Sequence, residues 1–144
     1  ARFEGDGGLG WLVRTMGPRP DFIRAVSVGP QGDIAIGGWF DSTSLVFEST
    51  SGDGGSLPHN SANDPSGFVA AYSPAGQFRW ARRIYGPQST DVRGVVMLAD
   101  GTVVATGAFA GTATFQLTSS QTVMLTSTSA TGSISDVFVA RFGP

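Results

Sequence analysis

The side chains that could carry out chemistry are few and stand far apart in the sequence. His59 is the only histidine, cysteine is absent, and all nine basic residues are arginines. His59 lies in a Pro-His-Asn-Ser segment with no second metal-ligand or catalytic pattern near it. Covalent catalysis needs a nucleophile, a base and an orienting group together, and no stretch of the sequence supplies the three. We therefore expect no enzyme activity, no catalytic residue, no metal site and no cofactor.

Two Asp-Gly-Gly segments, at residues 6–8 and 53–55, raise the question of calcium binding. Calcium takes about six to eight oxygen ligands, usually from several carboxylates at alternate positions. Here the only acidic neighbours are Glu4 and Glu48, one for each segment. Tight turns favour Asp and Gly, so we interpret both segments as turns.

Three residues are candidates for ligand binding. Arg24 and Arg93 occupy equivalent positions of the internal repeat described below. A repeated guanidinium either binds an anionic ligand or forms a structural ion pair. Asp21 and Asp91 are the candidate partners for an ion pair. Trp39 is not repeated. An exposed indole stacks on sugar rings, whereas a packed one fills a wedge between sheets. The sequence thus keeps glycans open as candidate partners.

Composition narrows the class of protein. The chain has 144 residues, a formal net charge of −2, 40% hydrophobic and 14% charged residues. This length fits one ordinary domain, and the hydrophobic share is too high for a wholly disordered chain. A mildly acidic chain with scattered arginines is a poor nucleic-acid binder. No run of about 18 apolar residues is present, so we expect no membrane span.

An internal repeat organises the sequence. Sliding the chain against itself by 69 residues aligns glycine, proline and aromatic positions in one register, and the offset becomes 70 towards the end. The matches include Trp11 with Trp80, Arg24 with Arg93, Gly38 with Gly107, Phe40 with Phe109, and Phe68-Val69-Ala70 with Phe138-Val139-Ala140. Chance similarity does not hold one register for so long, so we infer a duplication.

Each repeat unit is expected to be built of short strands, because apolar and β-branched runs alternate with Gly/Pro turns and no helical spacing occurs. Strands are predicted at 22–28, 33–40, 68–72 and 78–84 in the first unit, and at 92–98, 102–109 and 137–142 in the second. A long connection separates the second and third strands of each unit. The later one predicts a hairpin over 112–117 and 122–126; the earlier one predicts exposed loops over 49–56 and 58–66.

The two ends of the chain are out of phase with the repeat. Ala1-Arg2-Phe3 matches Ala140-Arg141-Phe142, a third strand, and leads into a predicted fourth strand at Leu9–Thr15. The second unit stops after its third strand. The sequence therefore predicts a spare fourth strand at the start and a missing one at the end. Since the chain begins without Met, we expect either removal of a leader or a place within a longer protein.

Residues 67–82, GFVAAYSPAGQFRWAR, resemble the hallmark of bacterial β-propeller repeats of the SBBP type, which runs roughly DAFVAKYDPDGNxxWA. Residues 136–142 and 6–11 repeat parts of it, and 91–95, 101–109 and 111–115 are similar to the strands that follow. Departures include Ala75 for Asp and Arg for Lys. The resemblance implies an all-β fold of two tandem four-stranded antiparallel propeller-type blades, with an extra hairpin or loop between second and third strands. It also implies a bacterial protein that is secreted or at the cell surface, and it carries over no catalytic residue.

These observations lead to a set of expectations about organisation and function. The chain should divide into a first blade with a spare strand, 1–77, and a second blade, 78–144. Two blades are fewer than the roughly four to eight that close a propeller, and open edges pair with other chains. We expect an extracellular structural module that forms a homo-oligomer or filament by head-to-tail strand exchange. The expected interface consists of Leu9, Trp11, Val13, Val137, Val139 and Phe142.

Several alternatives remain open at this point. Instead of a structural module, the chain could be a glycan-binding module that uses Trp39, Arg24 and Arg93. It could also be a fragment of a longer propeller. Copies that exchange strands close a ring if the rotation per copy permits it, and otherwise build a fibre. A chain that closes onto its own end as a small sandwich is the rival to exchange.

Overall fold

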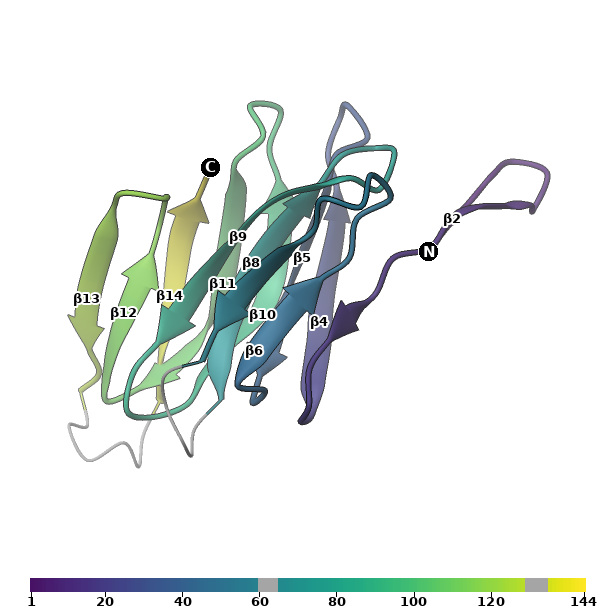
Figure 1. The fold of residues 1–144 in the computed structure, drawn as a ribbon. Helices are drawn as coiled ribbons and strands as arrows, with labels where there is room; N and C mark the ends of the chain where they lie inside the picture. The colour runs from purple at the N-terminus through teal and green to yellow at the C-terminus, as the bar shows by residue number, and fades with distance from the viewer. Residues whose placement is uncertain (60–64, 129–134) are drawn as a thin grey trace.

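The fold is known from a computed structural model, which describes residues 1–59, 65–128 and 135–144 (Figure 1). Every regular element in these residues is a β-strand, as predicted, and none of them forms a helix that could cross a membrane. The strands are β1 (Arg2–Phe3), β2 (Leu9–Trp11), β3 (Thr15–Met16), β4 (Asp21–Val28), β5 (Ile34–Phe40), β6 (Ser44–Phe47), β7 (Gly55–Pro58), β8 (Ser66–Tyr72), β9 (Phe78–Tyr85), β10 (Thr90–Met97), β11 (Val103–Ala110), β12 (Thr112–Gln116), β13 (Thr122–Thr126) and β14 (Ser135–Phe142).

The first repeat unit is the antiparallel meander β4-β5-β8-β9, in which each strand pairs with the next. Its predicted tight turns are present. Gly32 and Gly76 close the β4–β5 and β8–β9 turns with φ of 83° and 78°, a region that favours glycine. The predicted boundary at 77/78 falls in the β8–β9 turn, so β9 lies in the sheet of the first unit; the division into two blades stays a prediction.

The second repeat unit, β10-β11-β14, reproduces the first three strands of that meander. Even an irregularity is repeated. The pairing of β4 with β5 shifts between Ile23 and Ala25, and that of β10 with β11 shifts between Val92 and Gly94. The extra residues in these two bulges are Arg24 and its repeat partner Arg93. The second sheet has no fourth strand of its own among the described residues, as the phase of the repeat predicts.

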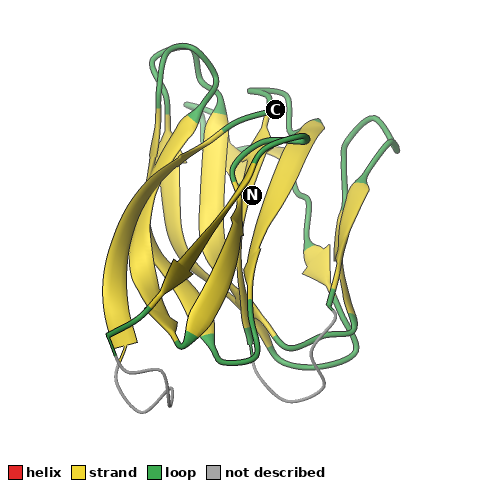
Figure 2. Cartoon of the chain, turned by 90° about the vertical axis from the view of Figure 1, so that its left-hand side faces the viewer, coloured by secondary structure: helices red, strands yellow, loops and turns green. Residues whose placement is uncertain are grey.

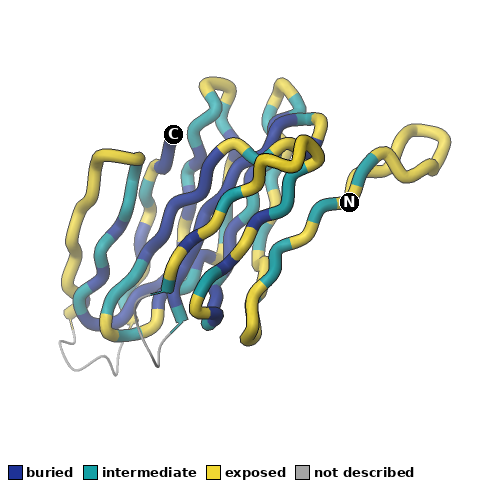
Figure 3. The backbone as a smooth tube through the Cα atoms, in the orientation of Figure 1, coloured by how far each residue is buried: buried dark blue, intermediate teal, exposed yellow. Residues whose placement is uncertain are grey.

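The two units pack face to face, with β10 lying against β4 and β5 (Figure 1), and Figure 2 shows the strands from the side. Side chains between the sheets form the larger core; Figure 3 colours the backbone of buried residues dark blue. Burying apolar surface contributes roughly 25 cal/mol per Å², so this seam stabilises the pair of units. Its buried members are Ala35, Val69, Ala71, Trp80, Ile84, Val92, Met97, Val103, Ala105, Phe109, Ala113, Phe115, Phe138 and Phe142.

The long connections form hairpins in both units. The predicted hairpin is present as β12–β13, and it joins the outer edge of β9 to give a six-stranded sheet. In the other connection the exposed loop expected over 49–56 is confirmed for residues 50–54 and wrong for residues 55–56, which belong to β7. β7 pairs with β6, and the two strands bury Leu45, Phe47 and Leu57 in a second core on the far face of the first sheet. The exposed loop expected over 58–66 is wrong at its two ends, because Pro58 belongs to β7 and Ser66 is buried in β8; residues 60–64 lie outside the described residues.

The expected continuous strand at Leu9–Thr15 is also wrong in detail. The structure has two short strands, β2 and β3, separated by residues 12–14. β2 pairs with β1, whereas β3 pairs with β6. A strand persists only where a neighbour satisfies its backbone groups, and within the described chain no third strand lies beside residues 12–14 to make the ladder continuous.

Candidate functional site

The N-terminal hairpin is a structural copy of the β8–β9 turn. β1 pairs with β2 through Arg2↔Trp11 and Phe3↔Leu9, with a shift between the two pairs. β8 pairs with β9 through Ala71↔Trp80 and Tyr72↔Phe78, with the same shift. Each residue lies 69 positions before its counterpart. The spare third-strand stub and fourth strand expected from the sequence therefore have the register of a repeat unit.

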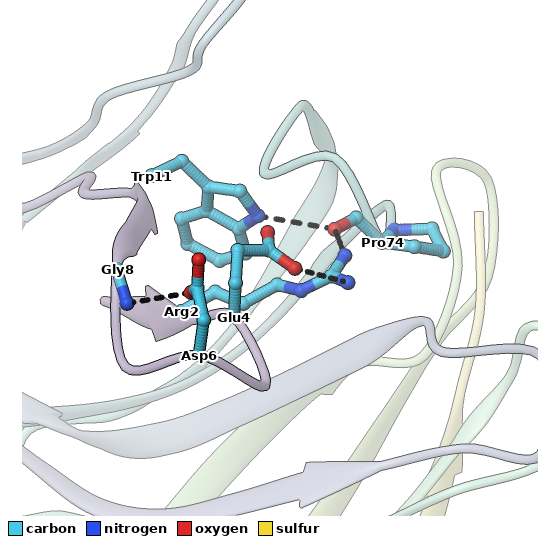
Figure 4. Close-up of polar contacts among 6 residues, drawn as sticks. All are labelled: Arg2, Glu4, Asp6, Gly8, Trp11 and Pro74. Carbon is cyan, nitrogen blue, oxygen red and sulfur yellow. Dashed lines mark hydrogen bonds and ion pairs between the residues drawn. The ribbon is translucent and has the colours of Figure 1, made fainter.

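This hairpin stands away from the body of the molecule (Figure 1), and its side chains bind the turn between β8 and β9 (Figure 4). The carbonyl oxygen of Pro74 accepts hydrogen bonds from Trp11 Nε1 at 3.1 Å and from Arg2 Nη1 at 3.0 Å. Asp6 Oδ1 accepts a bond from the Gly8 amide at 2.9 Å, so this aspartate serves the turn. No cluster of three or more potential metal ligands occurs in residues 1–59, 65–128 and 135–144.

The insertion hairpins attach to these strands in equivalent ways. β6 pairs with the end of β3 through Thr15↔Phe47, and β12 pairs with the end of β9 through Phe115↔Ile84. Thr15 and Ile84 are again 69 residues apart. β2 and β3 together therefore occupy the place of the fourth strand of a further unit, whose first and second strands are not supplied by the described residues on this side of the molecule.

Residues 12–14 are held from one side. Arg14 Nε donates to Glu48 Oε1 at 2.7 Å, and the Arg14 amide donates to Oε2 at 3.2 Å. The hydrogen bond from the Arg14 side chain holds the pKa of Glu48 below its ordinary value. The Arg14 carbonyl accepts a bond from the Glu48 amide. Since backbone groups alternate sides along an extended chain, those of Val13 point the opposite way, where the rest of a sheet would continue.

Beneath this segment lies an apolar groove of about 660 Å³ between the N-terminal strands and the free face of β4 and β5. Its floor carries Ile23, Val26, Val28, Ile34 and Ile36, and Trp11, Val13 and Tyr72 close one side. Isolated surface valines are ordinary, but a contiguous apolar patch marks a binding surface. The groove is thus an apolar candidate site that the described residues form beside β4.

Burial of Tyr72 at the side of the groove raises the pKa of its phenol to about 12. Because the folded chain holds the proton more tightly than the unfolded chain, this stabilisation is present at neutral pH and is lost as pH rises from about 10 through 12. We expect wild-type protein to lose about 2 kcal/mol more than a Tyr72→Phe chain over that range. Urea unfolding at several pH values measures this; parallel pH profiles for the two chains would contradict it.

The other end of the molecule presents an open edge and an open face. β14 is an edge strand of its sheet. Val137 and Val139 on it are 84% and 75% exposed, whereas Phe142 is buried in the core at 1%, so only the backbone of Phe142 lies at the edge. Arg141 forms an ion pair with Asp100. Hydrogen bonds from Thr102 and the charge of Arg141 hold the pKa of Asp100 below its ordinary value.

The three candidate ligand residues lie near one another at the seam between the sheets. Arg24 and Arg93 both approach Asp91, at 3.9 and 3.1 Å, so Asp91, one of the two expected partners, is shared. Asp21 instead accepts a bond from Ser42 Oγ at 2.7 Å. The Trp39 ring lies 4.8 Å from that of Phe22, which takes up contact surface of the indole. A role for these residues in binding a sugar or an anion stays a prediction.

Two arginines that sequence reasoning did not single out are buried in β9. Burial lowers the pKa of both Arg82 and Arg83. Arg83 donates to the Pro58 carbonyl and its guanidinium lies 3.8 Å from the centre of the Tyr85 ring. Arg82 Nη1 donates to the Ala81 carbonyl at 2.7 Å. These contacts tie β9 to its surroundings and do not open onto the groove.

The sequence reasoning also missed the groove. It named Leu9, Trp11 and Val13 on the N-terminal segment but not Val26 and Val28 on the floor. The sequence alone carried no signal for it, because the repeat maps these valines onto Val95 and Met97, which are also apolar; only the structure shows that Val95 and Met97 belong to the core between the sheets. A residue that is core in one unit and exposed in the other marks a face without its partner.

Comparison with known proteins supports a propeller-type repeat. The sequence matches no family model. It is 25% identical over 121 residues to an uncharacterized WD repeat-containing protein of Acanthamoeba polyphaga mimivirus, a match that covers 80% of this chain and 9% of the relative. The chain therefore spans about a tenth of that protein's length. Together with the repeated antiparallel sheets, the likeness supports a β-propeller-like repeat protein; it does not extend to the bacterial SBBP type.

Proposed function

We propose that this chain is a non-enzymatic, extracellular structural repeat module that assembles head to tail by strand complementation. The observation that carries the proposal is the equality of register between the β1–β2 and β8–β9 hairpins. One end of the chain offers a fourth strand, and the other end has three strands with an open edge. A second copy supplies what each end lacks.

The repeat fixes the register of the proposed contact. Within the chain, Val69 pairs with Arg82 and Gly67 with Ile84. The counterparts of these pairs are Val139 with Val13, and Val137 with Thr15. β14 of one copy would thus run antiparallel to residues 9–15 of the next, with Arg141 and Phe142 taking the places that Arg2 and Phe3 hold beside β2.

Two features of the ends favour association between copies over closure of one chain onto itself. β2 and β14 lie on opposite sides of the molecule (Figure 1), and β2 pairs with β1 while β14 pairs with β11. The backbone of Val13 already points away from β6. An incoming strand therefore needs to displace only the two-residue strand β1.

The first test of this proposal removes the donated strand. We expect a chain that lacks residues 1–16 to stay monomeric at concentrations where the intact chain associates, as measured by light scattering and sedimentation velocity. Because β3 also pairs with β6, a second variant leaves β3 in place. Val13→Pro removes an amide in the middle of the donated strand that faces the incoming strand, and we expect it to abolish association as well.

Leu12→Pro is the matched control, since its amide points to the β6 side of the same segment and should leave association intact. Circular dichroism and thermal melting of each variant check that the monomer folds. An unchanged distribution of oligomers in the truncated chain and in Val13→Pro would contradict the proposal.

A further inference from the structure

We infer that the groove beside β4 is the docking site for the exposed face of β10, β11 and β14 of a second copy of this chain. The inference rests on the proposed head-to-tail association and identifies the two faces that it buries.

The chain already contains one covered example of this seam. The face of the second unit that meets the first is formed by Val92, Val95, Met97, Val103 and Ala105, all within the larger core. They pack against Ala35, Val69 and Ala71 of the first unit. The Met97 amide also donates to Ser27 Oγ at 3.1 Å, across the two sheets.

The floor of the groove is the repeat counterpart of that covered face. The 69-residue offset maps Ile23, Val26, Val28, Ile34 and Ile36 onto Val92, Val95, Met97, Val103 and Ala105. The apolar character is kept at every position, but the burial is not. Val28 is 67% exposed and its counterpart Met97 is 4% exposed. Ile34 and Ile36 pack against the second core, whereas Ile23, Val26 and Val28 are exposed. The first unit thus carries a docking face of the same kind that the described residues cover only in part.

The other half of the seam lies at the far end of the molecule. The residues of the first unit that meet β10 include Ser27, Gly37 and Val69, and their counterparts in the second unit are Val96, Thr106 and Val139. All three counterparts are exposed. One molecule therefore presents both faces of one type of seam, one at each end, which is the arrangement that a head-to-tail contact requires.

The internal seam also indicates which side chains would meet. A Cβ placed on Gly37 would lie 2.6 Å from Val92 and 2.7 Å from Val95. Transferred by the repeat, Thr106 of one copy faces Ile23 and Val26 of the next. Because Thr106 is larger than glycine, the sheets across the new seam must stand further apart near β4 than they do within the chain.

The proposed strand pairing brings the same face to the groove. The groove lies between the N-terminal segment, which carries Trp11 and Val13, and β4. A β14 strand that pairs with residues 9–15 therefore carries its own sheet over the floor of the groove. Edge and face are then engaged by one rigid body, which is why a second copy fits here better than an unrelated ligand.

The test uses the full chain and two charge substitutions at exposed positions, Val28→Arg in the groove and Val139→Arg on the opposite face. Each buries a charge only in the assembly, so each monomer should fold normally. We expect each variant alone to associate at least about 100-fold more weakly than wild type in sedimentation velocity. Met124→Arg on β13, at an exposed position outside both faces, is the control and should associate like wild type.

A mixture of the Val28→Arg and Val139→Arg chains tests whether the two faces bind each other. Val28→Arg keeps an intact β14 face and Val139→Arg keeps an intact groove, so the mixture should form a one-to-one dimer that grows no further. If both variants associate like wild type while Val13→Pro blocks association, the docking faces are wrong and strand complementation stands. If wild type itself stays monomeric, or the variants fail to complement each other, the inference is overturned.

Discussion

Replacing Gly38 or Gly107 by alanine should destabilise the protein more than any other single methyl group added to a strand. A Cβ at Gly38 would overlap the carbonyl oxygen of Phe22, and one at Gly107 would overlap that of Asp91. Both carbonyls belong to backbone at the repeated bulges, where the extra residue pushes the neighbouring strand inwards. Relief requires movement of the strands, and overpacking of this kind costs about 2–3 kcal/mol.

Thermal melting and urea unfolding of the two alanine chains measure the loss, which corresponds to a fall in Tm on the order of 10 °C for a domain of this size. Gly67→Ala is the matched control. It lies in β8 with ordinary space around it, the nearest atoms being 3.4 Å from an added Cβ, and its repeat counterpart is Val137. If the Tm values of Gly38→Ala and Gly107→Ala equal that of Gly67→Ala, the bulges do not require glycine and the prediction is wrong.

The strands of both units could be predicted because each is bounded by turn residues and carries alternating β-branched or aromatic side chains. Gly76 and Gly101 illustrate this, as both take positive φ in the turns where the sequence placed them. The hairpin β12–β13 was likewise visible in its threonine-rich alternation. The repeat strengthened these predictions, because a strand or turn with a weak local pattern in one unit was supported by its counterpart 69 residues away.

The hairpin β6–β7 escaped prediction because its strands are short and stand in a segment rich in serine and glycine. Leu45 and Phe47 are buried by the far face of the first sheet, which is a tertiary contact that no local pattern reports. The break between β2 and β3 has a similar origin. The sequence of residues 9–15 favours one strand, but its length in the structure depends on which neighbours are present to pair with it.

The strand edges of the candidate site could be predicted from the sequence, but the apolar groove could not. The phase of the repeat at the two ends predicted which strands lack partners, and hence Val13 and Val139. It did not indicate which face of β4 is covered, because Val26 and Val95 look alike in the sequence while one is at the surface and the other joins the core. Only the stacking of the two sheets separates these cases.

The proposed register between β14 of one copy and residues 9–15 of the next can be tested with an engineered disulfide. Val13 and Val139 would face each other as an antiparallel pair, with Cα atoms about 5.5 Å apart, which lies within the range of a disulfide. The chain has no cysteine, so a chain carrying Val13→Cys and Val139→Cys has no competing thiols. The control is a chain that carries Val13→Cys and Ala99→Cys, because Ala99 lies on an exposed turn.

Non-reducing gel electrophoresis of the oxidised Val13→Cys/Val139→Cys chain is the most direct test of head-to-tail complementation. We predict a ladder of disulfide-linked dimers, trimers and higher species that collapses on reduction, with no such ladder for the Val13→Cys/Ala99→Cys control. A cross-linked monomer would show that the chain closes onto itself, and the absence of any cross-link would show that β14 does not meet residues 9–15 in this register; either result contradicts the proposal.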